Sequence, residues 1–138
     1  MLLLAATLFL TTCLGCGERG PGLIPVAGQV TYGGGAWPQA GKIYFNPVQP
    51  AEGFSKLSGS ADFAADGSFT VQSTGNKQGL LPGKYRVNLE CWEEQPSMAG
   101  ATPTPGKSYV PEGWVSPEIE IPVGAASHQV TIDVPKRK

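Results

Sequence analysis

The chain has few of the residues from which metal and redox sites are built. Its 138 residues include three cysteines and one histidine. Cys13 and Cys16 have the C-x-x-C spacing, but a zinc site needs further ligands and a thioredoxin-like site needs a surrounding βαβ pattern. Cys91 and His128 are the remaining candidates, and they form no second paired motif. We therefore expect no metal site and no cofactor.

Charged residues are also scarce. They make up 15% of the chain and nearly cancel, to a formal net charge of −1. A nucleic-acid-binding surface needs clustered Lys and Arg. The basic tail Lys136–Lys138 is too short for that role and is interpreted as a solvated terminus. We therefore expect no nucleic-acid partner.

The sequence lacks an apolar run long enough to cross a bilayer as a helix. The run from Leu2 to Leu10 extends at most to Leu14, whereas a spanning helix needs ~20 apolar residues. This run has the length of the hydrophobic core of a signal peptide. The basic residues that usually precede such a core are missing, because the first Lys or Arg is Arg19. The segment is therefore interpreted as a signal peptide without its basic part.

The residues after this run, "TTCLGCGERGPG", resemble the lipobox of bacterial lipoproteins. In a lipobox, a small residue precedes a cysteine that becomes the lipidated first residue of the mature protein. Cys16 fits best, because the small Gly15 stands before the cut. Cys13 is the alternative, but it leaves the larger Thr12 at the cut. The resemblance implies a lipoprotein signal peptide over residues 1–15 and a palmitate-type lipid anchor on the membrane.

Glycine and proline are frequent in the remaining sequence, with 19 and 13 residues in the whole chain. Long helices are hard to place in such a sequence, so short strands joined by turns are expected. A hydrophobic content of 41% is enough for a core. We expect a flexible tether over residues 16–25 and one folded domain over residues 26–138.

Alternation of apolar and polar residues predicts the strands. They are expected at residues 26–32, 42–47, 56–63, 68–73, 80–92, 118–121 and 127–135. Pro47 is expected to end the second strand, and the Asp-Gly pair at Asp66 predicts a hairpin between the third and fourth. Cys91 falls on the apolar face of its strand and is interpreted as a small buried side chain. Residues 93–106 have no periodicity and predict a long mobile loop.

About seven strands in one domain is the count of a Greek-key β-sandwich. Five motifs occur in order: V-x-G-x-V-T, a glycine turn, a strand ending near F-x-P, a degenerate D-x-D-G-x-F, and L-x-P-G-x-Y-x-V. They lie at Val26–Thr31, Gly33–Gly35, Ile43–Pro47, Asp62–Phe69 and Leu81–Val87. A later segment, "YVPEGW…SPEIEIPV", has Gly113-Trp114 where Lys-Tyr is usual.

In these motifs the chain resembles small secreted lipoproteins of planctomycete-type bacteria that carry a carboxypeptidase-regulatory-like, or transthyretin-like, domain. Ala64 and Ala65 dilute the D-x-D-G turn, and Leu81 replaces one proline. The resemblance covers nearly the whole mature chain. It implies a transthyretin-like or Ig-like β-sandwich outside the cell, and it implies no activity.

The sequence shows no recognisable catalytic constellation. His128 lies just before the last predicted strand, on its polar face, and is interpreted as an exposed residue rather than a base. Asp62 and Asp66 flank a turn, where Asp bonds to its own backbone, and they lack the dense oxygen array that calcium needs. An internal Lys–Asn isopeptide bond is excluded, because the first strand has no Lys and the last no Asn.

Trp37, Trp92 and Trp114 fall at turns or strand ends. They are candidates for a binding surface that stacks on sugar rings or on a partner protein, although capping of the core is the preferred interpretation. We expect a non-catalytic, lipid-anchored module of the cell envelope, on its periplasmic or extracellular face, with an envelope protein or polysaccharide as partner. The alternative is an accessory domain of an envelope hydrolase, or a hydrolase whose site is not recognisable.

Overall fold

The computed structural model describes residues 22–138, which contain strands and no helix. Within this range no helix is available to span a bilayer. The strands are β1 (Val26–Tyr32), β2 (Gly41–Pro50), β3 (Gly59–Phe63), β4 (Ser68–Thr70), β5 (Gln72–Ser73), β6 (Lys77–Gln78), β7 (Gly83–Glu90), β8 (Trp92–Glu94), β9 (Lys107–Ser108), β10 (Ile119–Ile121) and β11 (His128–Val134). The predicted signal peptide, with Cys13 and Cys16, lies outside the described residues.

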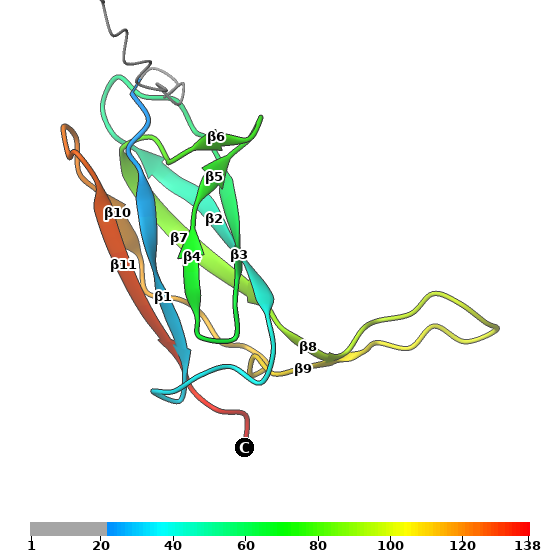
Figure 1. Cartoon of the computed structure of the whole chain (residues 1–138). Coiled ribbons are helices and arrows are strands. Elements are labelled where there is room, and N and C mark those ends of the chain that lie inside the picture. Colours follow the sequence, from blue (N-terminus) through cyan, green and yellow to red (C-terminus); the bar gives the residue numbers. More distant parts are fainter. Residues whose placement is uncertain (1–21) are drawn as a thin grey trace, which may run out of the picture.

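The strands form two main sheets (Figure 1). One has three strands in the order β11-β1-β4, and the other has six in the order β10-β7-β2-β3-β5-β6. β1 and β11 pair in parallel along their whole length, from Val26↔His128 to Tyr32↔Val134. The prediction of an all-β fold is confirmed, and the two sheets are consistent with a β-sandwich. The eleven strands of residues 22–138 outnumber the seven expected, because pairing also creates strands of two or three residues that have no periodic pattern of their own.

Both sheets contribute to one hydrophobic core, as the alternation predicts. Val30 of β1, Phe45 of β2, Val87 of β7 and Ile132 of β11 are all buried in it. Ile24 is buried as well, because its backbone N–H and C=O both bond to Leu80, at 2.8 and 2.9 Å. The packed domain thus includes Ile24, which precedes the predicted start of the domain at residue 26.

β2 continues past Pro47 to Pro50, so the prediction that Pro47 ends this strand is wrong. β3 pairs with β2 only as far as Phe45, and beyond that residue β2 has β7 as its sole neighbour. A proline without an N–H is tolerated where a strand is paired on one side only. The register with β7 also shifts between Pro47 and Gln49, which is the irregularity of a β-bulge.

The turn at Asp66-Gly67 forms as predicted, but the strands on either side of it do not pair as one hairpin. β3 lies in the six-stranded sheet, whereas β4 pairs with β1 in the other sheet. The chain then returns to pair β5 with β3. Gly67 has φ 86°, and its carbonyl accepts a hydrogen bond from the Val30 amide at 2.9 Å. This turn therefore carries the chain from one sheet to the other.

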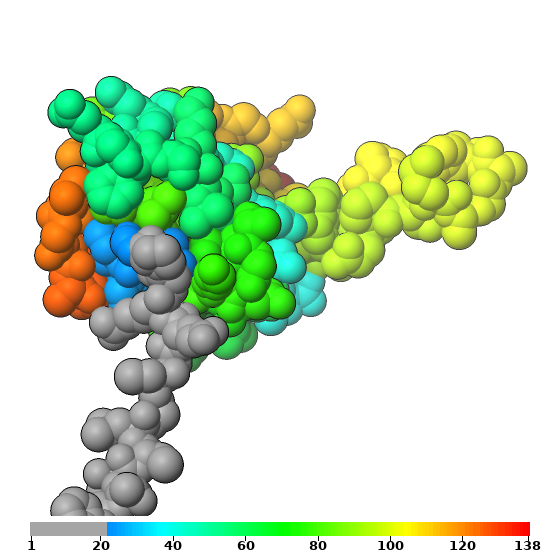
Figure 2. All heavy atoms as spheres, turned by 90° about the horizontal axis from the view of Figure 1, so that it is seen from above, coloured from blue at the N-terminus to red at the C-terminus, as the bar shows by residue number. Residues whose placement is uncertain are grey.

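Residues 92–108 form a projecting arm with a two-stranded base, where the sequence predicts a long mobile loop over residues 93–106. β8 and β9 pair at its base, and an isolated bridge joins Ser97 to Thr104 further out. Figures 1 and 2 show the arm standing clear of the body of the domain. The pairing at the base was not predicted, because backbone groups make it and its side chains need no alternation when neither face is buried.

Candidate functional site

The three tryptophans do not share one environment. Trp37 is only 3% exposed, its Nε1–H donates to the Val30 carbonyl at 3.1 Å, and its ring stacks on Tyr32. Trp114 is partly buried and packs against the core. Trp92 is the first residue of β8 and lines a surface hollow together with polar side chains. Of the three predicted surface residues, Trp92 is therefore the one placed beside a polar hollow.

The outer face of the six-stranded sheet is polar, because every second residue of its strands points away from the core. Tyr44 of β2 lies opposite Ser60 of β3 and Asn88 of β7. In the next row, Lys42 lies opposite Asp62 and Glu90. Ser60 in turn lies opposite Gln72 of β5. The pairing thus assembles hydroxyl, amide, ammonium and carboxylate groups from four strands on one surface.

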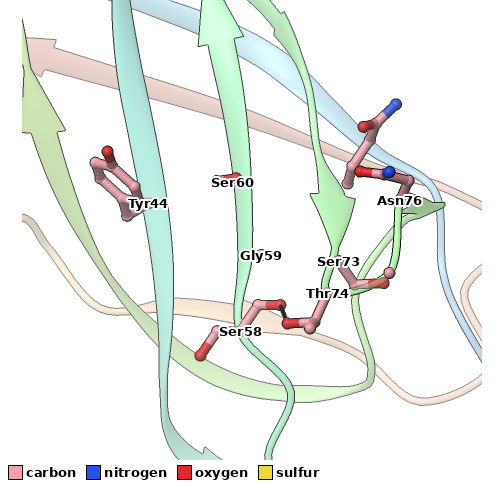
Figure 3. Close-up of a pocket in the computed structure, with 9 residues that line it drawn as sticks. Tyr44, Ser58, Gly59, Ser60, Ser73, Thr74 and Asn76 are labelled. Carbon is pink, nitrogen blue, oxygen red and sulfur yellow. Dashed lines mark hydrogen bonds between the residues drawn. The ribbon is translucent and has the colours of Figure 1, made fainter.

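Three shallow hollows follow β3 across this face. The first, of about 270 Å³, lies between Tyr44 and the turn that carries Asn76, and Figure 3 shows these two side chains on opposite sides of Ser60. The second has about 440 Å³ and the third, beside Trp92, about 370 Å³.

The three hollows adjoin one another, because neighbouring hollows share lining residues. Ser60, Gln72 and Asn76 line both the first and the second, and Lys42 and Asp62 line both the second and the third. We call the three together the polar groove. It runs from the turn at residues 74–76 to the base of the arm.

The charged groups of the polar groove are mutually paired yet open to solvent. Lys42 Nζ lies 3.7 Å from Asp62 Oδ1, with 44% and 85% of the two side chains exposed. The Tyr44 hydroxyl donates to Glu90 Oε2 at 3.2 Å. Desolvation, followed by the Glu90 carboxylate, raises the pKa of Tyr44. Tyr44 therefore stays protonated as a donor, while the carboxylates keep free acceptor positions for a ligand.

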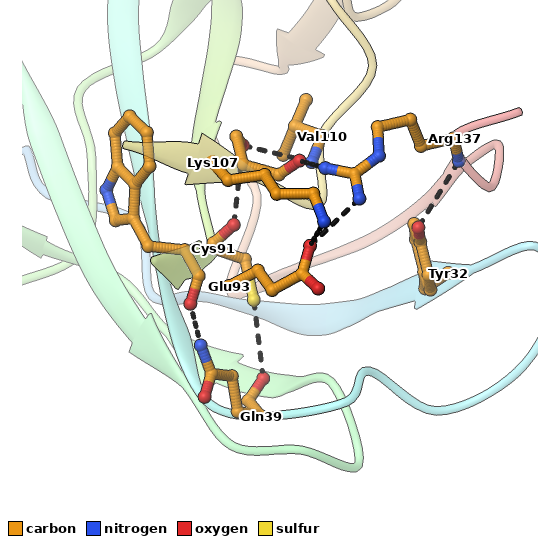
Figure 4. A network of polar contacts seen from close by, with 9 residues as sticks. Tyr32, Gln39, Cys91, Glu93, Lys107, Val110 and Arg137 are labelled. Atoms are coloured by element: carbon orange, nitrogen blue, oxygen red, sulfur yellow. Dashed lines mark hydrogen bonds and ion pairs between the residues drawn. The ribbon is translucent and has the colours of Figure 1, made fainter. Parts of the chain in front are cut away.

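The arm holds the Trp92 end of the polar groove in place. The Gln39 side-chain amide donates to the Trp92 carbonyl, and Glu93 Oε2 lies 2.9 Å from Lys107 Nζ and 2.8 Å from Arg137 Nη2 (Figure 4). The basic tail is exposed, as its interpretation as a solvated terminus predicts, but the Arg137 guanidinium also pairs with Glu93. A charge pair across distant segments has no local signature in the sequence.

Cys91 and His128 lie outside the polar groove. Cys91 is 1% exposed, as its interpretation as a small buried side chain predicts, and its thiol donates to the Gln39 carbonyl at 3.5 Å. Burial raises the pKa of this thiol. His128 is half-buried and is the first residue of β11, on the same face as Val130. Its assignment to the polar face is wrong, because residues two apart in a strand share a face.

The two aspartates of the predicted turn have different roles. Asp66 accepts hydrogen bonds from the backbone N–H and the hydroxyl of Ser68, at 2.9 and 2.7 Å. These bonds lower the pKa of Asp66 and show the turn role that the sequence predicts. Asp62 instead points from β3 into the polar groove. Within residues 22–138, no three His, Cys, Asp or Glu side chains gather as a metal site would require.

Sequence reasoning singled out Trp92 but missed Tyr44, Gln72 and Asn76. The outward-facing polar residues of the alternating strands could have indicated this site. The alternation was used only to predict which side chains are buried. Which polar residues meet depends on strand order and register, and these come from the fold. No family model, curated protein or solved structure matches the chain.

Proposed function

We propose that this protein is a non-catalytic, lipid-anchored module of the cell envelope that binds polysaccharide through the polar groove. The observation that carries the proposal is the composition of this groove, which combines the rings of Tyr44 and Trp92 with amides, hydroxyls and carboxylates. Sugar rings have apolar C–H faces that pack on aromatic rings, and hydroxyls that exchange hydrogen bonds with amides and carboxylates. The polar groove offers both kinds of contact.

A polysaccharide fits this surface better than a protein does. The centre of a protein interface is depleted of charged residues and is anchored by buried apolar side chains. Ser60, Lys42 and Asp62 occupy the middle of the polar groove instead. The large hydrophobic side chains that are exposed within residues 22–138 lie elsewhere, at Val48, Met98, Val115 and Val123.

The sequence motifs support the remaining elements of the proposal. They favour a Greek-key, transthyretin-like form of the β-sandwich, and the lipobox favours attachment of lipid to Cys16 after removal of residues 1–15. Each acyl CH₂ that enters the membrane contributes about 0.8 kcal/mol, so two or three chains hold a protein firmly. The anchored domain then works by contact, on the periplasmic or extracellular face of the envelope.

Sedimentation with insoluble polysaccharides tests the binding function. Cellulose, chitin, mannan and bacterial cell-wall sacculi are incubated with the folded protein and with its Tyr44→Ala, Trp92→Ala and Trp114→Ala variants. We expect the original protein to sediment with at least one of them. Trp92→Ala and Tyr44→Ala should bind about tenfold more weakly, which corresponds to about 1.4 kcal/mol.

Trp114→Ala is the matched control, because Trp114 is also partly buried but lies outside the polar groove. Thermal unfolding confirms that each variant is folded. Binding to none of the polymers, or equal binding by all variants, contradicts the proposal. Release of soluble sugar from a polymer would contradict its non-catalytic part and favour the hydrolase alternative.

Labelling of cells with an alkyne fatty acid tests the anchor. The original protein and Cys13→Ala should be labelled, and Cys16→Ala should not. If labelling is lost in Cys13→Ala and kept in Cys16→Ala, the lipid is attached to Cys13. Equal labelling of all three proteins would contradict attachment at either single cysteine.

A further inference from the structure

The polar groove is longer than one sugar. Gly59 lines its first hollow and Asp62 its third, and both residues belong to β3. At about 3.3 Å per residue they lie about 10 Å apart. The third hollow continues beyond Asp62 to Trp92 and to Gln95 on the arm. A single pyranose ring cannot touch Asn76 and Trp92 at once, whereas an extended chain of several rings can.

The direction of the polar groove also limits the shape of its ligand. Its hollows follow one another along β3 and share residues at each junction, so together they form an elongated polar track. Extended chains fit such a track, because each successive ring meets a new pair of polar side chains. A compact or strongly coiled chain would leave part of the track uncovered.

The charges of the polar groove argue against an acidic ligand. Lys42 is the single cation among the residues that line its hollows, and it stands between the carboxylates of Asp62 and Glu90. The half of the polar groove next to Asn76 has uncharged side chains, including Tyr44 and Gln72. A polymer with a carboxylate on each ring would place like charges together, and such contacts disfavour a partner.

We propose that the polar groove binds one extended strand of an uncharged polysaccharide along β3, with Asn76 at one end and Trp92 at the other. This inference rests on the proposed function and adds to it the polymeric and uncharged character of the ligand. Affinity then depends on the number of linked sugars that occupy the polar groove, and both ends contribute to the binding of a long chain.

Calorimetric titration with oligosaccharides tests the length requirement. The probes are β-1,4-linked oligomers of one to six units of glucose, of N-acetylglucosamine and of mannose. For at least one series, we expect affinity to rise at least tenfold from the dimer to the hexamer. Asn76→Gly and Trp92→Ala should each weaken binding of the hexamer, and the double variant should bind the hexamer about as weakly as the dimer.

Asn76→Gly is chosen because Asn76 has φ 59°, a backbone conformation that glycine adopts freely. This variant removes the side chain without straining the turn. Trp114→Ala is again the control and should bind the hexamer like the original protein. Equal affinity for monomer and hexamer, or an effect on the hexamer from one end only, overturns the extended-strand inference but leaves the proposed function standing. If no oligomer of any series binds, the extended-strand inference fails, and the proposed function fails with it only if the protein also sediments with none of the polymers.

The charge requirement is tested on the hexamer that binds best. Oxidation of its C6 hydroxyls to carboxylates changes the charge and leaves the linkage unchanged. We expect the oxidised hexamer to bind at least tenfold more weakly at low salt, with part of the loss recovered in high salt because charges at an exposed surface are screened. Equal or tighter binding of the oxidised hexamer overturns the inference that the ligand is uncharged.

Discussion

Glu93 and Arg137, 44 residues apart in the sequence, are joined by an ion pair of 2.8 Å between Oε2 and Nη2. The same carboxylate oxygen lies 2.9 Å from Lys107 Nζ, on the other strand of the arm. The Arg137 guanidinium also donates to the Ser108 carbonyl, and the Arg137 amide donates to the Tyr32 hydroxyl at 3.2 Å. Glu93 therefore ties both strands of the arm to the segment that follows β11.

Replacement of Glu93 should loosen the arm without unfolding the domain. Glu93→Gln removes the charge that holds Lys107 and Arg137, all three of which are partly exposed. We expect faster hydrogen exchange of the amides of residues 92–108 and an unchanged midpoint of urea unfolding. Glu94→Gln is the control, because Glu94 makes no ion pair within residues 22–138. Identical exchange in the two variants would contradict the role given to Glu93.

The arm should also loosen in acid. Hydrogen bonds from Lys107 and then Arg137 lower the pKa of Glu93 in the folded protein. A carboxyl group with a lowered folded pKa contributes stability that is complete above its unfolded pKa, about 4.3, and is lost as the pH falls through the folded value. Exchange of the arm amides, corrected for intrinsic rates, should therefore be constant from pH 7 to about 5 and rise below about 4. Glu93→Gln should abolish this rise in the exchange rate of the arm amides. A rise that begins near pH 6 would indicate that a different group titrates.

The Cys91 thiol should be unreactive in the folded protein. It is 1% exposed, and burial raises its pKa, so little thiolate is present and little of it can be reached. In a Cys13→Ser, Cys16→Ser variant, we expect negligible reaction with an aromatic disulfide reagent at pH 8 and complete reaction in denaturant. Rapid modification before unfolding would show that the β7 end of the core opens readily.

Gly28 should not tolerate a side chain. A Cβ atom at this position would lie 1.9 Å from the Val130 carbonyl oxygen of the paired strand and 3.0 Å from the Phe69 ring. Gly28→Ala should lower the free energy of unfolding by about 1–3 kcal/mol, as overpacking of a core does. Gly35→Ala is the control, because the nearest atom to its Cβ would be 3.9 Å away and neither glycine has a positive φ. Equal urea midpoints for the two variants would show that β1 and β11 can separate without cost.

The position of the core strands could be predicted, whereas their partners could not. Val87 and Leu89 alternate with Arg86 and Asn88, so the burial of β7 is visible within the strand itself. Nothing in β2 or β7 predicts that Lys42 meets Glu90, because that pairing depends on register. For this reason, only part of the candidate site could be predicted. Trp92 is recognisable as a tryptophan at a strand end, but its neighbours in the site come from other strands.

Two errors have the same physical origin. The turn after Asp62 was expected to close a hairpin, yet β4 pairs with β1 and β5 with β3. Residues 93–106 were expected to form a long mobile loop, and the backbone pairing of β8 with β9 at its base was not expected. Backbone donors and acceptors are the same in nearly every residue, so the sequence carries little information about which of them are joined.

Local chemistry, readable in the sequence alone, determined that residues 22–138 are all-β, where most core strands lie and which side chains they bury. Period-two alternation and the backbone limits of glycine and proline act within a few residues, so no partner is needed to recognise them. The tertiary structure alone decided that β1 runs parallel to β11, that Glu93 holds Arg137, and that residues of six strands line one groove. These features depend on contacts between distant segments, which form only when the whole core assembles.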